Sequence, residues 1–316
     1  MLYLTEAEVE QLLPMRDALR EVEAVLREMG EGHAENRPRQ RVRTGESLLS
    51  VMAAGWPSRG YFGFKYYTIT RDGARYRFHL FDAGTSELVA VLEADRMGQR
   101  RTGAASGVAT KYLARPDASA VGIVGAGWQA EGQLEAIAQV RSIREIRCYG
   151  RDRGRRSTFA ETMSRRLGIP VRDVESAEQA VRDAEIVVTA TDAREPVVSG
   201  EWLKEGTHVN AMGSNRADTR ELDDAVVVRS TRILCDSLEQ ARIEAGDLVI
   251  PVSKGLLAWD RVHELGELVA GRADGRAGAD EITLFKSLGI ALEDVAVGSF
   301  VFEKARKEGV GTEMRI

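Results

Sequence analysis

The pattern of residues 120–133, AVGIVGAGWQAEGQ, predicts a strand, a glycine-rich turn and a helix in direct succession, and this order constrains the fold most strongly. The strand is expected at Val121–Val124. Gly125 permits a tight turn, Gly127 lets the backbone approach a phosphate at the helix N-terminus, and Ala130 suits the close helix–strand contact of the third position. A plain glycine turn has the same letters, but the strand–turn–helix context favours a dinucleotide-binding turn.

Strand-like and helix-like segments alternate from Arg115 onward. The expected strands are SAVGIVG, REIRCYG, PVRDV, EIVVTAT, THVNAMG and RILCDS. Helical stretches such as QAEGQLEAIAQV and RRSTFAETMSRRLG separate the first of them. This alternation is typical of an α/β fold with a doubly wound parallel sheet of the Rossmann type. We therefore expect a Rossmann dinucleotide-binding domain over residues 114–290.

Strand-like segments follow one another without helices before residue 95. They are SLLSVMAAG, YFGFKYYTIT and YRFHLFDAGTSELVAVLEA, and two helices precede them, the first with Thr5 and Glu8 as a capping box. Consecutive strands predict an antiparallel sheet. We expect a smaller α+β domain over residues 1–113, joined by a C-terminal helical segment, 291–316.

The composition excludes several classes of function. The net charge of −5 predicts neither a nucleic acid nor an anionic membrane as partner, and no stretch approaches a membrane span. Cys148 and Cys235 lie far apart, as expected for reduced thiols in a cytoplasmic protein. The four histidines form no ligand pattern, so we expect no metal.

The letters CYGRDRGRR at the end of the second Rossmann strand favour NADP(H) over NAD(H). Gly150 stands where an acid would hold the ribose of NAD, and it leaves room for a 2′-phosphate. Arg151, with Arg153 or Arg155, would supply the donors that a phosphate requires. NAD(H) stays possible, because Asp152 would be the ribose acid if the strand ended later.

Several stretches, spread over nearly the whole chain, resemble the ornithine cyclodeaminase/mu-crystallin family. They are RPRQ, GFKYYT, RTGAASGVATKYLARP, VGIVGAGWQAEGQ, GTHVNAMGSN with REL, LEQA, and EITLFKSLGIALEDVA, of which RTGAA and FKSLG are more specific than the glycine turn. The resemblance implies a homodimer whose first domain, residues 1–113, supplies both the substrate site and the dimer interface. It also implies a bound nicotinamide cofactor and a small amino or imino acid as substrate.

By the same resemblance, three cations surround the substrate carboxylate: Arg39, Lys65 and Arg101. Arg41 is an alternative to Arg39, because basic residues alternate in PRQRVR and only one parity faces inward. Three cations in an apolar-walled cleft are tolerable only if an anion joins them. Each cation alone also fits a solvated surface charge.

The resemblance adds cofactor contacts to the turn. Thr102 would contact the pyrophosphate or ribose, and Met212 and Ser287 would lie on the nicotinamide side. The complete expected set is Thr102, Gly125, Ala126, Gly127, Gln129, Gly150, Arg151, Asp152, Thr191, Met212 and Ser287.

Two residues depart from the cyclodeaminase pattern. Asn215 stands where cyclodeaminases carry an aspartate that handles protons, and Ser50 where they carry a glutamate for the distal amine. An amide cannot accept a proton near neutral pH, although Asn215 also fits a turn position with positive φ. Lys65 is then the remaining acid/base candidate, if burial among cations lowers its pKa.

These residues predict an NAD(P)H-dependent oxidoreductase that transfers hydride to the C=N carbon of a small imino or cyclic imino acid, of the ketimine reductase or amino-acid dehydrogenase type. Lys65 and Asn215 are the catalytic candidates. Two alternatives are a cyclodeaminase that acts as an ammonia-lyase on a diamino acid with tightly bound NAD, and a non-catalytic, crystallin-like binding protein.

Overall fold

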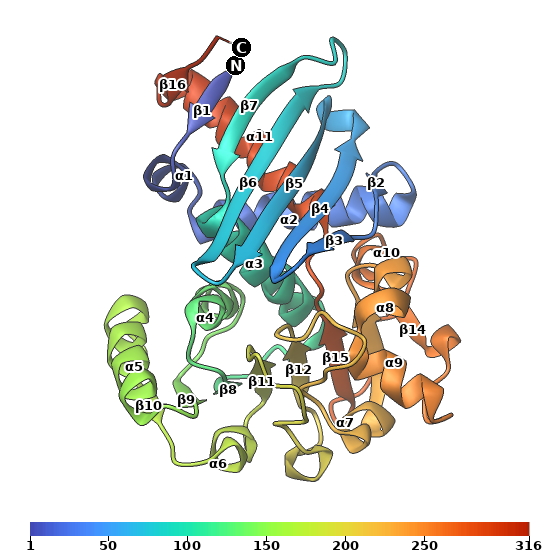
Figure 1. Ribbon diagram of the computed structural model, residues 1–316. Helices are drawn as coiled ribbons and strands as arrows, with labels where there is room; N and C mark the ends of the chain where they lie inside the picture. Colours follow the sequence, from blue (N-terminus) through green and yellow to red (C-terminus); the bar gives the residue numbers. More distant parts are fainter. Residues whose placement is uncertain (316) are drawn as a thin grey trace. The chain divides into compact units, whose positions relative to one another are not determined.

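A computed structural model describes residues 1–315, which form two compact units (Figure 1). The first unit comprises Met1–Ala104 and the segment that begins at Gly289, and the second comprises Ala105–Leu288. Each unit is built on its own eight-stranded sheet.

The sheet of the first unit has the order β16-β1-β7-β6-β5-β4-β2, with β3 paired to β4. Its strands are β1 (Leu2–Leu4), β2 (Glu35–Asn36), β3 (Gln40–Thr44), β4 (Ser47–Trp56), β5 (Tyr61–Thr70), β6 (Gly73–Asp82), β7 (Leu88–Glu93) and β16 (Thr312–Glu313). All pairs are antiparallel except β1 with β7, which is parallel. The prediction of an antiparallel sheet is therefore confirmed for the central hairpins. It misses the parallel pair of β1 and β7, between which α1 and α2 lie in the sequence.

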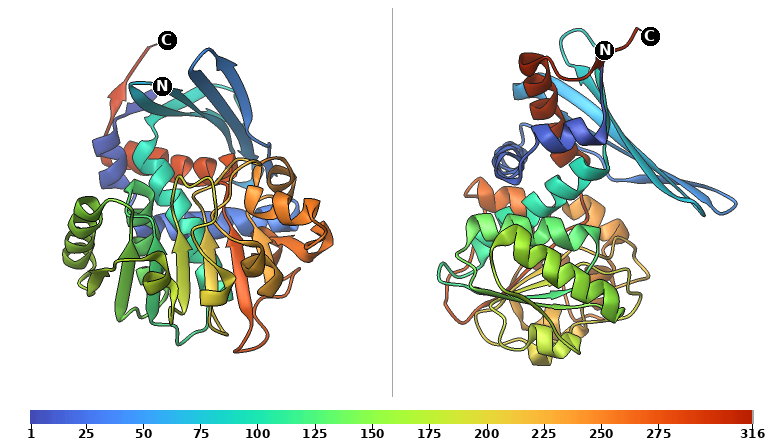
Figure 2. Two further views of the ribbon diagram at one scale, coloured as in Figure 1. Left: turned by 60° about the horizontal axis from the view of Figure 1, so that its bottom comes forward. Right: turned by 90° about the vertical axis from the view of Figure 1, so that its left-hand side faces the viewer.

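Helices cover one face of this sheet (Figure 2). They are α1 (Glu6–Leu12), α2 (Met15–Glu31) and α11 (Ala291–Glu308), while α3 (Asp95–Leu113) follows β7. The capping box predicted at Thr5 and Glu8 is present at the start of α1. The helix α11 packs on β4, β5, β6 and α2, and most of its side chains are buried. A C-terminal segment therefore completes the core beneath the central strands.

The sheet of the second unit is entirely parallel, in the order β10-β9-β8-β11-β12-β15-β13-β14. Its strands are β8 (Ala120–Val124), β9 (Glu145–Tyr149), β10 (Val171–Asp173), β11 (Ile186–Thr189), β12 (His208–Ala211), β13 (Ser230–Cys235), β14 (Val262–Glu264) and β15 (Ile282–Lys286). Its helices are α4 (Trp128–Val140), α5 (Arg153–Leu167), α6 (Ala177–Val181), α7 (Asp224–Arg229), α8 (Leu238–Glu244), α9 (Gly246–Ser253) and α10 (Leu265–Val269). The doubly wound parallel sheet is confirmed, and its order changes direction between β8 and β11.

The strands β14 and β15 were not expected from the sequence. All five side chains of β15 are buried, and the strand lies between β12 and β13, although β13 precedes it in the chain. An alternating strand–helix pattern predicts only the order of strands along the chain. It cannot predict that a later strand inserts between two earlier ones in the sheet. Within residues 1–315, no helix has the length and apolar character that crossing a membrane requires.

Candidate functional site

The turn between β8 and α4 leaves the N-terminus of α4 open. Gly125 has a φ of +117°, and a Cβ atom there would lie 2.3 Å from the carbonyl oxygen of Ala190, so no other residue fits. Gly127 is the N-cap of α4, without a side-chain capping bond and with open space around its Cα. Backbone N–H groups at such an end are suited to a phosphate.

A cavity of about 840 Å³ adjoins this turn at the carboxyl ends of β8, β9 and β11, where the strand order changes direction. That edge is where open α/β sheets bind nucleotides. The cavity brings together seven of the predicted cofactor residues: Gly125, Ala126, Gly127, Gly150, Arg151, Asp152 and Thr191. In the first turn of α4, the Oε1 atom of Gln129 is buried without a hydrogen-bond partner in the described structure, an acceptor that a bound molecule would satisfy. These features fit a dinucleotide.

At the end of β9, Asp152 and Arg151 have different tasks. The Asp152 carboxylate caps α5 by accepting a hydrogen bond from the Arg155 amide at 2.8 Å. Arg151 pairs with Asp192 at 2.9 Å, and both side chains are more than 80% exposed. Arg151 and Arg155 line the same cavity as Gly150, and so does Arg194.

The buried carboxylate of Glu221, to which sequence analysis assigned no role, links the ends of β11 and β12 by hydrogen bonds. Its Oε1 accepts hydrogen bonds from the amide and the hydroxyl of Thr191, both at 2.7 Å. Its Oε2 accepts from the Thr189 hydroxyl at 2.8 Å and the Gly213 amide at 2.7 Å. Burial raises the pKa of Glu221. The letters REL were part of the resemblance, yet only the fold shows that this side chain holds a cavity residue.

The loop after β12 carries Asn215 and is anchored by a buried ion pair. Lys286, the last residue of β15, donates to the Ser214 carbonyl at 2.6 Å and lies 2.8 Å from Asp247. The expected positive φ of Asn215 is wrong, because Ser86 and Asp183 are the non-glycine residues with positive φ in the described chain. Asn215 therefore adopts ordinary backbone geometry on a loop that its neighbours hold in place.

Met212 and Ser287 follow directly on two paired residues, Ala211 of β12 and Lys286 of β15. The two predicted nicotinamide contacts therefore begin side by side at the carboxyl edge of the parallel sheet. The Met212 amide donates to the Thr189 carbonyl at 3.1 Å, and the Ser287 hydroxyl donates to an Asp236 carboxylate oxygen at 3.4 Å.

In the first unit, the structure brings two of the three predicted cations, Lys65 and Arg101, to one carboxylate. The Lys65 ammonium donates to Asp294 Oδ1 at 2.8 Å, and the Arg101 Nε donates to the same oxygen at 3.0 Å. Arg101 also donates from a terminal nitrogen to Glu293 at 3.1 Å. Lys65, Arg101, Glu293 and Asp294 are all buried.

Arg39, the third cation, lies close to the same residues. It is buried, donates to the Gly289 carbonyl at 3.1 Å and points its Nε at the Met52 sulfur at 3.4 Å. A Cβ atom on Gly289 would lie 2.3 Å from an Arg101 nitrogen, so Gly289 adjoins both arginines. We refer to Arg39, Lys65, Arg101, Glu293 and Asp294 together as the charge cluster.

The expectation that an external anion must balance the three cations is only partly right. Glu293 and Asp294, which sequence reasoning missed, supply two negative charges from α11. Their signal was present in the letters ALEDVA, but acidic residues near a helix N-terminus usually stabilise the helix dipole. The cluster as defined contains three cations and two carboxylates, an excess of one positive charge among these five residues.

Burial distinguishes Arg39 from its alternative, Arg41. Arg41 pairs with Ser50 across β3 and β4 and is half-buried, whereas Arg39 is buried. Ser50 is fully buried, and its hydroxyl has no hydrogen-bond partner in the described structure.

The strand β5 turns Lys65 inward. Gly63, Lys65 and Tyr67 are buried, while Phe64 and Tyr66 between them are partly exposed, the alternation of a strand with one covered face. Burial, followed by the charge of Arg101, lowers the pKa of Lys65 to about 8, against the raising effect of Asp294. This agrees with the expectation, made from the sequence, that burial among cations lowers the pKa of Lys65. A pKa of about 8 allows the Lys65 ammonium to transfer a proton near neutral pH.

Thr102 is buried on α3, where its hydroxyl donates to the Gly98 carbonyl at 2.7 Å. Among residues 1–315, no group of three or more His, Cys, Asp or Glu side chains is arranged to hold a metal ion.

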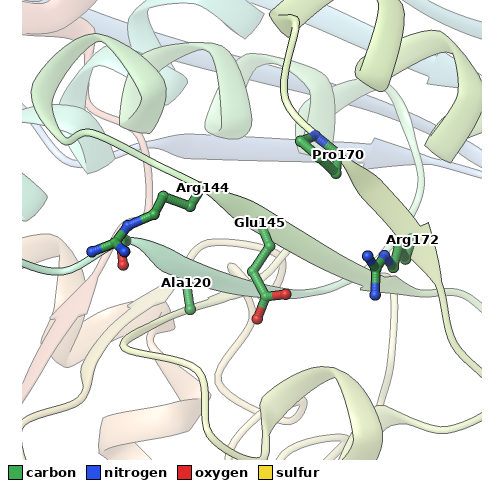
Figure 3. A pocket seen from close by; sticks show the side chains of 6 residues that line it. Ala120, Arg144, Glu145, Pro170 and Arg172 are labelled. Atoms are coloured by element: carbon green, nitrogen blue, oxygen red, sulfur yellow. The ribbon is translucent and has the colours of Figure 1, made fainter.

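A second cavity, of about 340 Å³, lies at the opposite edge of the parallel sheet, at the amino ends of β8, β9 and β10. Figure 3 shows the side chains of Arg144 and Arg172 on either side of Glu145. This edge lacks the glycine turn and the open helix N-terminus, so it does not share the features of the dinucleotide cavity.

Comparison with known proteins agrees with the geometry. A Δ1-pyrroline-2-carboxylate reductase of Bacillus cereus is 40% identical over 236 residues, which cover 74% of this chain and 72% of the relative. The solved structure of a Thermococcus litoralis Δ1-pyrroline-2-carboxylate reductase in complex with NADH and L-proline is 37% identical, with a TM-score of 0.95 over 99% of this chain and 100% of the other.

An archaeal alanine dehydrogenase, solved as a dimer with bound NAD, is 35% identical, with a TM-score of 0.94 over 100% of this chain and 99% of the other. The model of the ornithine cyclodeaminase/mu-crystallin family matches residues 1–309. With the doubly wound sheet, the open glycine turn and the charge cluster, these matches identify the chain as a member of the ornithine cyclodeaminase/mu-crystallin family.

Proposed function

We propose that this protein is an NAD(P)H-dependent oxidoreductase that transfers hydride to the C=N carbon of a small imino or cyclic imino acid. The observation that carries the proposal is the charge cluster: three buried cations stand against two carboxylates, and one of the cations is a lysine with a pKa of about 8. Buried cations favour an anionic ligand, so a substrate carboxylate would be bound strongly there.

The first unit would serve as the substrate-binding and dimerisation domain, and the second as the dinucleotide-binding domain. When bound, the nicotinamide supplies the hydride. Arg39 and Arg101 would hold the substrate carboxylate, and Lys65 would hold or deliver a proton at the substrate nitrogen. Arg41 is the weaker candidate for the carboxylate because it is only half-buried.

The cavity residues would hold the cofactor: the turn Gly125–Gly127 its pyrophosphate, and Thr191 and Gln129 its neighbouring groups. Thr102, Met212 and Ser287 are proposed to complete that set. Asn215 would orient groups by hydrogen bonding and would not take up a proton. Without an aspartate there and with Ser50 in place of a glutamate, the site suits imine reduction better than cyclodeamination.

NADP(H) is the favoured cofactor. Asp152 already caps α5, while Arg151 and Arg155 line the cavity beside Gly150, which supports recognition of a 2′-phosphate. NAD(H) stays possible, because the Thermococcus and archaeal structures contain NADH and NAD.

A homodimer formed through the open face of the first unit's sheet is proposed as the working assembly. Phe62 is stacked on Phe81 at 5.4 Å between ring centroids, and Phe64 on His79 at 4.8 Å, all on the face opposite to Lys65. A stable dimer commonly covers such an apolar surface. The two buried, unpaired cysteines fit a cytoplasmic protein.

The test is a substrate panel followed at the nicotinamide absorbance. We expect oxidation of NADPH with Δ1-pyrroline-2-carboxylate or with 2-oxo acids plus an amine, and little turnover of the corresponding carboxamides. Ammonia release from L-ornithine without net cofactor turnover would favour the cyclodeaminase. Cofactor binding with neither reaction would favour a crystallin-like binding protein.

A further inference from the structure

Two neighbouring carboxylates at the start of α11 have different partners. Glu293 and Asp294 are both fully buried, but Glu293 contacts Arg101, whereas Asp294 contacts both Lys65 and Arg101. Burying a carboxylate is costly unless it is paired, so the contacts with Arg101 and Lys65 offset the cost of burying these two groups.

Asp294 is the group that joins the two cations. Its oxygens lie 2.7 and 2.8 Å from the Lys65 ammonium, and Oδ1 lies 3.0 Å from the Arg101 Nε. One carboxylate oxygen therefore accepts from both cations. This contact fixes the separation of two side chains that come from β5 and α3.

We infer that Asp294 is a positioning residue for the proposed reduction: its carboxylate holds the Lys65 ammonium and the Arg101 guanidinium in one arrangement and keeps Lys65 protonated until substrate binds. This inference rests on the proposed function. For a neutral imine, an N–H bond of Lys65 breaks as an N–H bond forms on the substrate nitrogen, while hydride from the nicotinamide reduces the carbon. Lys65 then regains its proton from solvent.

The charges around Lys65 determine the sign of the effect. Arg101 from α3 and Arg39 from the segment before β3 both disfavour its protonated form, and Asp294 from α11 favours it. Its strand neighbours, Met52 on β4 and Phe78 on β6, carry no charge.

Other titratable groups near Lys65 do not change that balance. Tyr67 and Tyr76 lie further along the same pair of strands, and burial raises the pKa of Tyr76, so it is neutral over the same pH range. Glu293 contacts Arg101 and not the ammonium among the ion pairs of residues 1–315. Loss of the Asp294 charge should therefore make Lys65 easier to deprotonate, and loss of the Glu293 charge should have a smaller effect.

The experiment titrates Lys65 directly. The chain contains few lysines (Lys65, Lys111, Lys204, Lys254, Lys286, Lys304 and Lys307), so protein labelled with ¹³C at the lysine ε-carbon gives a simple spectrum, and Lys65→Arg identifies the resonance. We expect a wild-type midpoint of about 8. In Asp294→Asn the midpoint should fall by about one pH unit or more, and in the matched control Glu293→Gln by clearly less.

The pH profile of imine reduction provides a second measurement. Because the protonated lysine is the active form, the alkaline limb of kcat/KM should move to lower pH in Asp294→Asn by the same amount as the NMR midpoint, and should stay near its wild-type position in Glu293→Gln. A simple loss of structure would lower activity at all pH values without moving this limb.

Several outcomes would overturn the inference: an unshifted Lys65 midpoint in Asp294→Asn, or equal shifts in both variants. If Asp294→Asn does not fold, Asp294→Glu replaces it, since it keeps the charge but moves the carboxylate. A near wild-type midpoint with lowered kcat would then support positioning, and an unchanged kcat would contradict it. If the wild-type protein reduces no imine, the proposed function fails, while the NMR titration still decides whether Asp294 controls Lys65.

Discussion

Asp152 at the end of β9 caps α5, and this task bears on the cofactor preference that we propose. Its carboxylate accepts a hydrogen bond from the Arg155 amide and so caps α5. A ribose hydroxyl would therefore compete with the Arg155 amide for this carboxylate. Arg151 has no such task, since its pair with Asp192 is largely exposed and contributes little to stability. The guanidinium can therefore exchange that partner for a phosphate.

Arg151→Ala should weaken NADPH binding by about 1–3 kcal/mol, the scale of a charge-assisted hydrogen bond, and leave NADH binding nearly unchanged. Fluorescence titration of both cofactors gives the two Kd values. Arg144→Ala, at the opposite edge of the parallel sheet, is the matched control and should change neither. Equal losses for NADPH and NADH would remove the 2′-phosphate assignment and return Asp152 as the ribose ligand.

Asn215→Asp should create or raise amino-acid oxidation, the reverse direction, in which a base must accept a proton. A carboxylate can do this near neutral pH, and the amide of Asn215 cannot. The assay follows NADP⁺ reduction with L-proline and other amino acids, with Asn215→Ser as a control that adds no charge. We expect little ammonia from L-ornithine with the unmodified protein, and rapid conversion to proline would show that the catalytic acid lies elsewhere.

The sequence predicts the cations of the charge cluster but not their counter-charges. Motifs point to Arg39, Lys65 and Arg101, because each lies in a stretch that resembles the family. Asp294 could not be assigned in the same way, since its role depends on α11 packing beneath β5, more than 200 residues away in the chain. Contacts at that separation follow from tertiary packing, which local patterns do not encode.

At the scale of elements, turn and capping residues in the sequence predict the helices and strands that lie directly beside them. The β8–α4 unit and the capped α1 are predicted correctly because their glycine and capping residues act on their own neighbours. The strand β15 was missed because its place between β12 and β13 depends on a long excursion of the chain. Five buried residues without alternation do not distinguish such a strand from a core helix.

The strand β12 contains a buried histidine that should make the fold sensitive to acid. The Nδ1 atom of His208 lies 2.9 Å from the Thr283 hydroxyl, and its Nε2 atom lies 3.2 Å from the Asn210 amide oxygen. Burial, and after it the charge of Arg276, lowers the pKa of His208 to about 3. In the unfolded chain a histidine titrates near pH 6.5. Below that pH the unfolded state takes up a proton that the folded state excludes, so stability falls with pH down to about 3.

His208→Asn should reduce this dependence. Between pH 7 and 5 the wild-type free energy of unfolding should fall by about 2 kcal/mol more than that of the variant. The reason is that the unfolded wild-type chain binds one more proton than the folded chain over about 1.5 pH units, from about pH 6.5 to 5. Urea denaturation at the two pH values measures the difference. His263→Asn, at an exposed position on β14, is the control and should retain the wild-type dependence. An identical loss in all three proteins would assign the acid sensitivity to other groups.

At the scale of the whole molecule, the aromatic face of the first unit's sheet is the surface that we propose for the dimer interface. Phe62 is 38% exposed and forms stacked contacts with Phe81, on the face that α11 leaves uncovered. Contiguous exposed aromatic side chains of this kind usually mark an interface. Side chains alternate between the two faces of β5, so the strand that buries Lys65 on one face places Phe62 and Phe64 on the other. The same strand therefore carries a residue of the charge cluster and two rings of the proposed dimer interface.

Phe62→Glu should convert a dimer into a monomer, because it places a charge where two apolar faces would meet. Light scattering coupled to size-exclusion chromatography at micromolar concentration gives the mass. Val228→Glu is the matched control: it introduces the same charge at an exposed apolar residue of α7, in the second unit, and should leave the dimer intact. A monomeric wild-type protein would contradict the proposed assembly, and a dimer that persists in Phe62→Glu would move the interface to another surface.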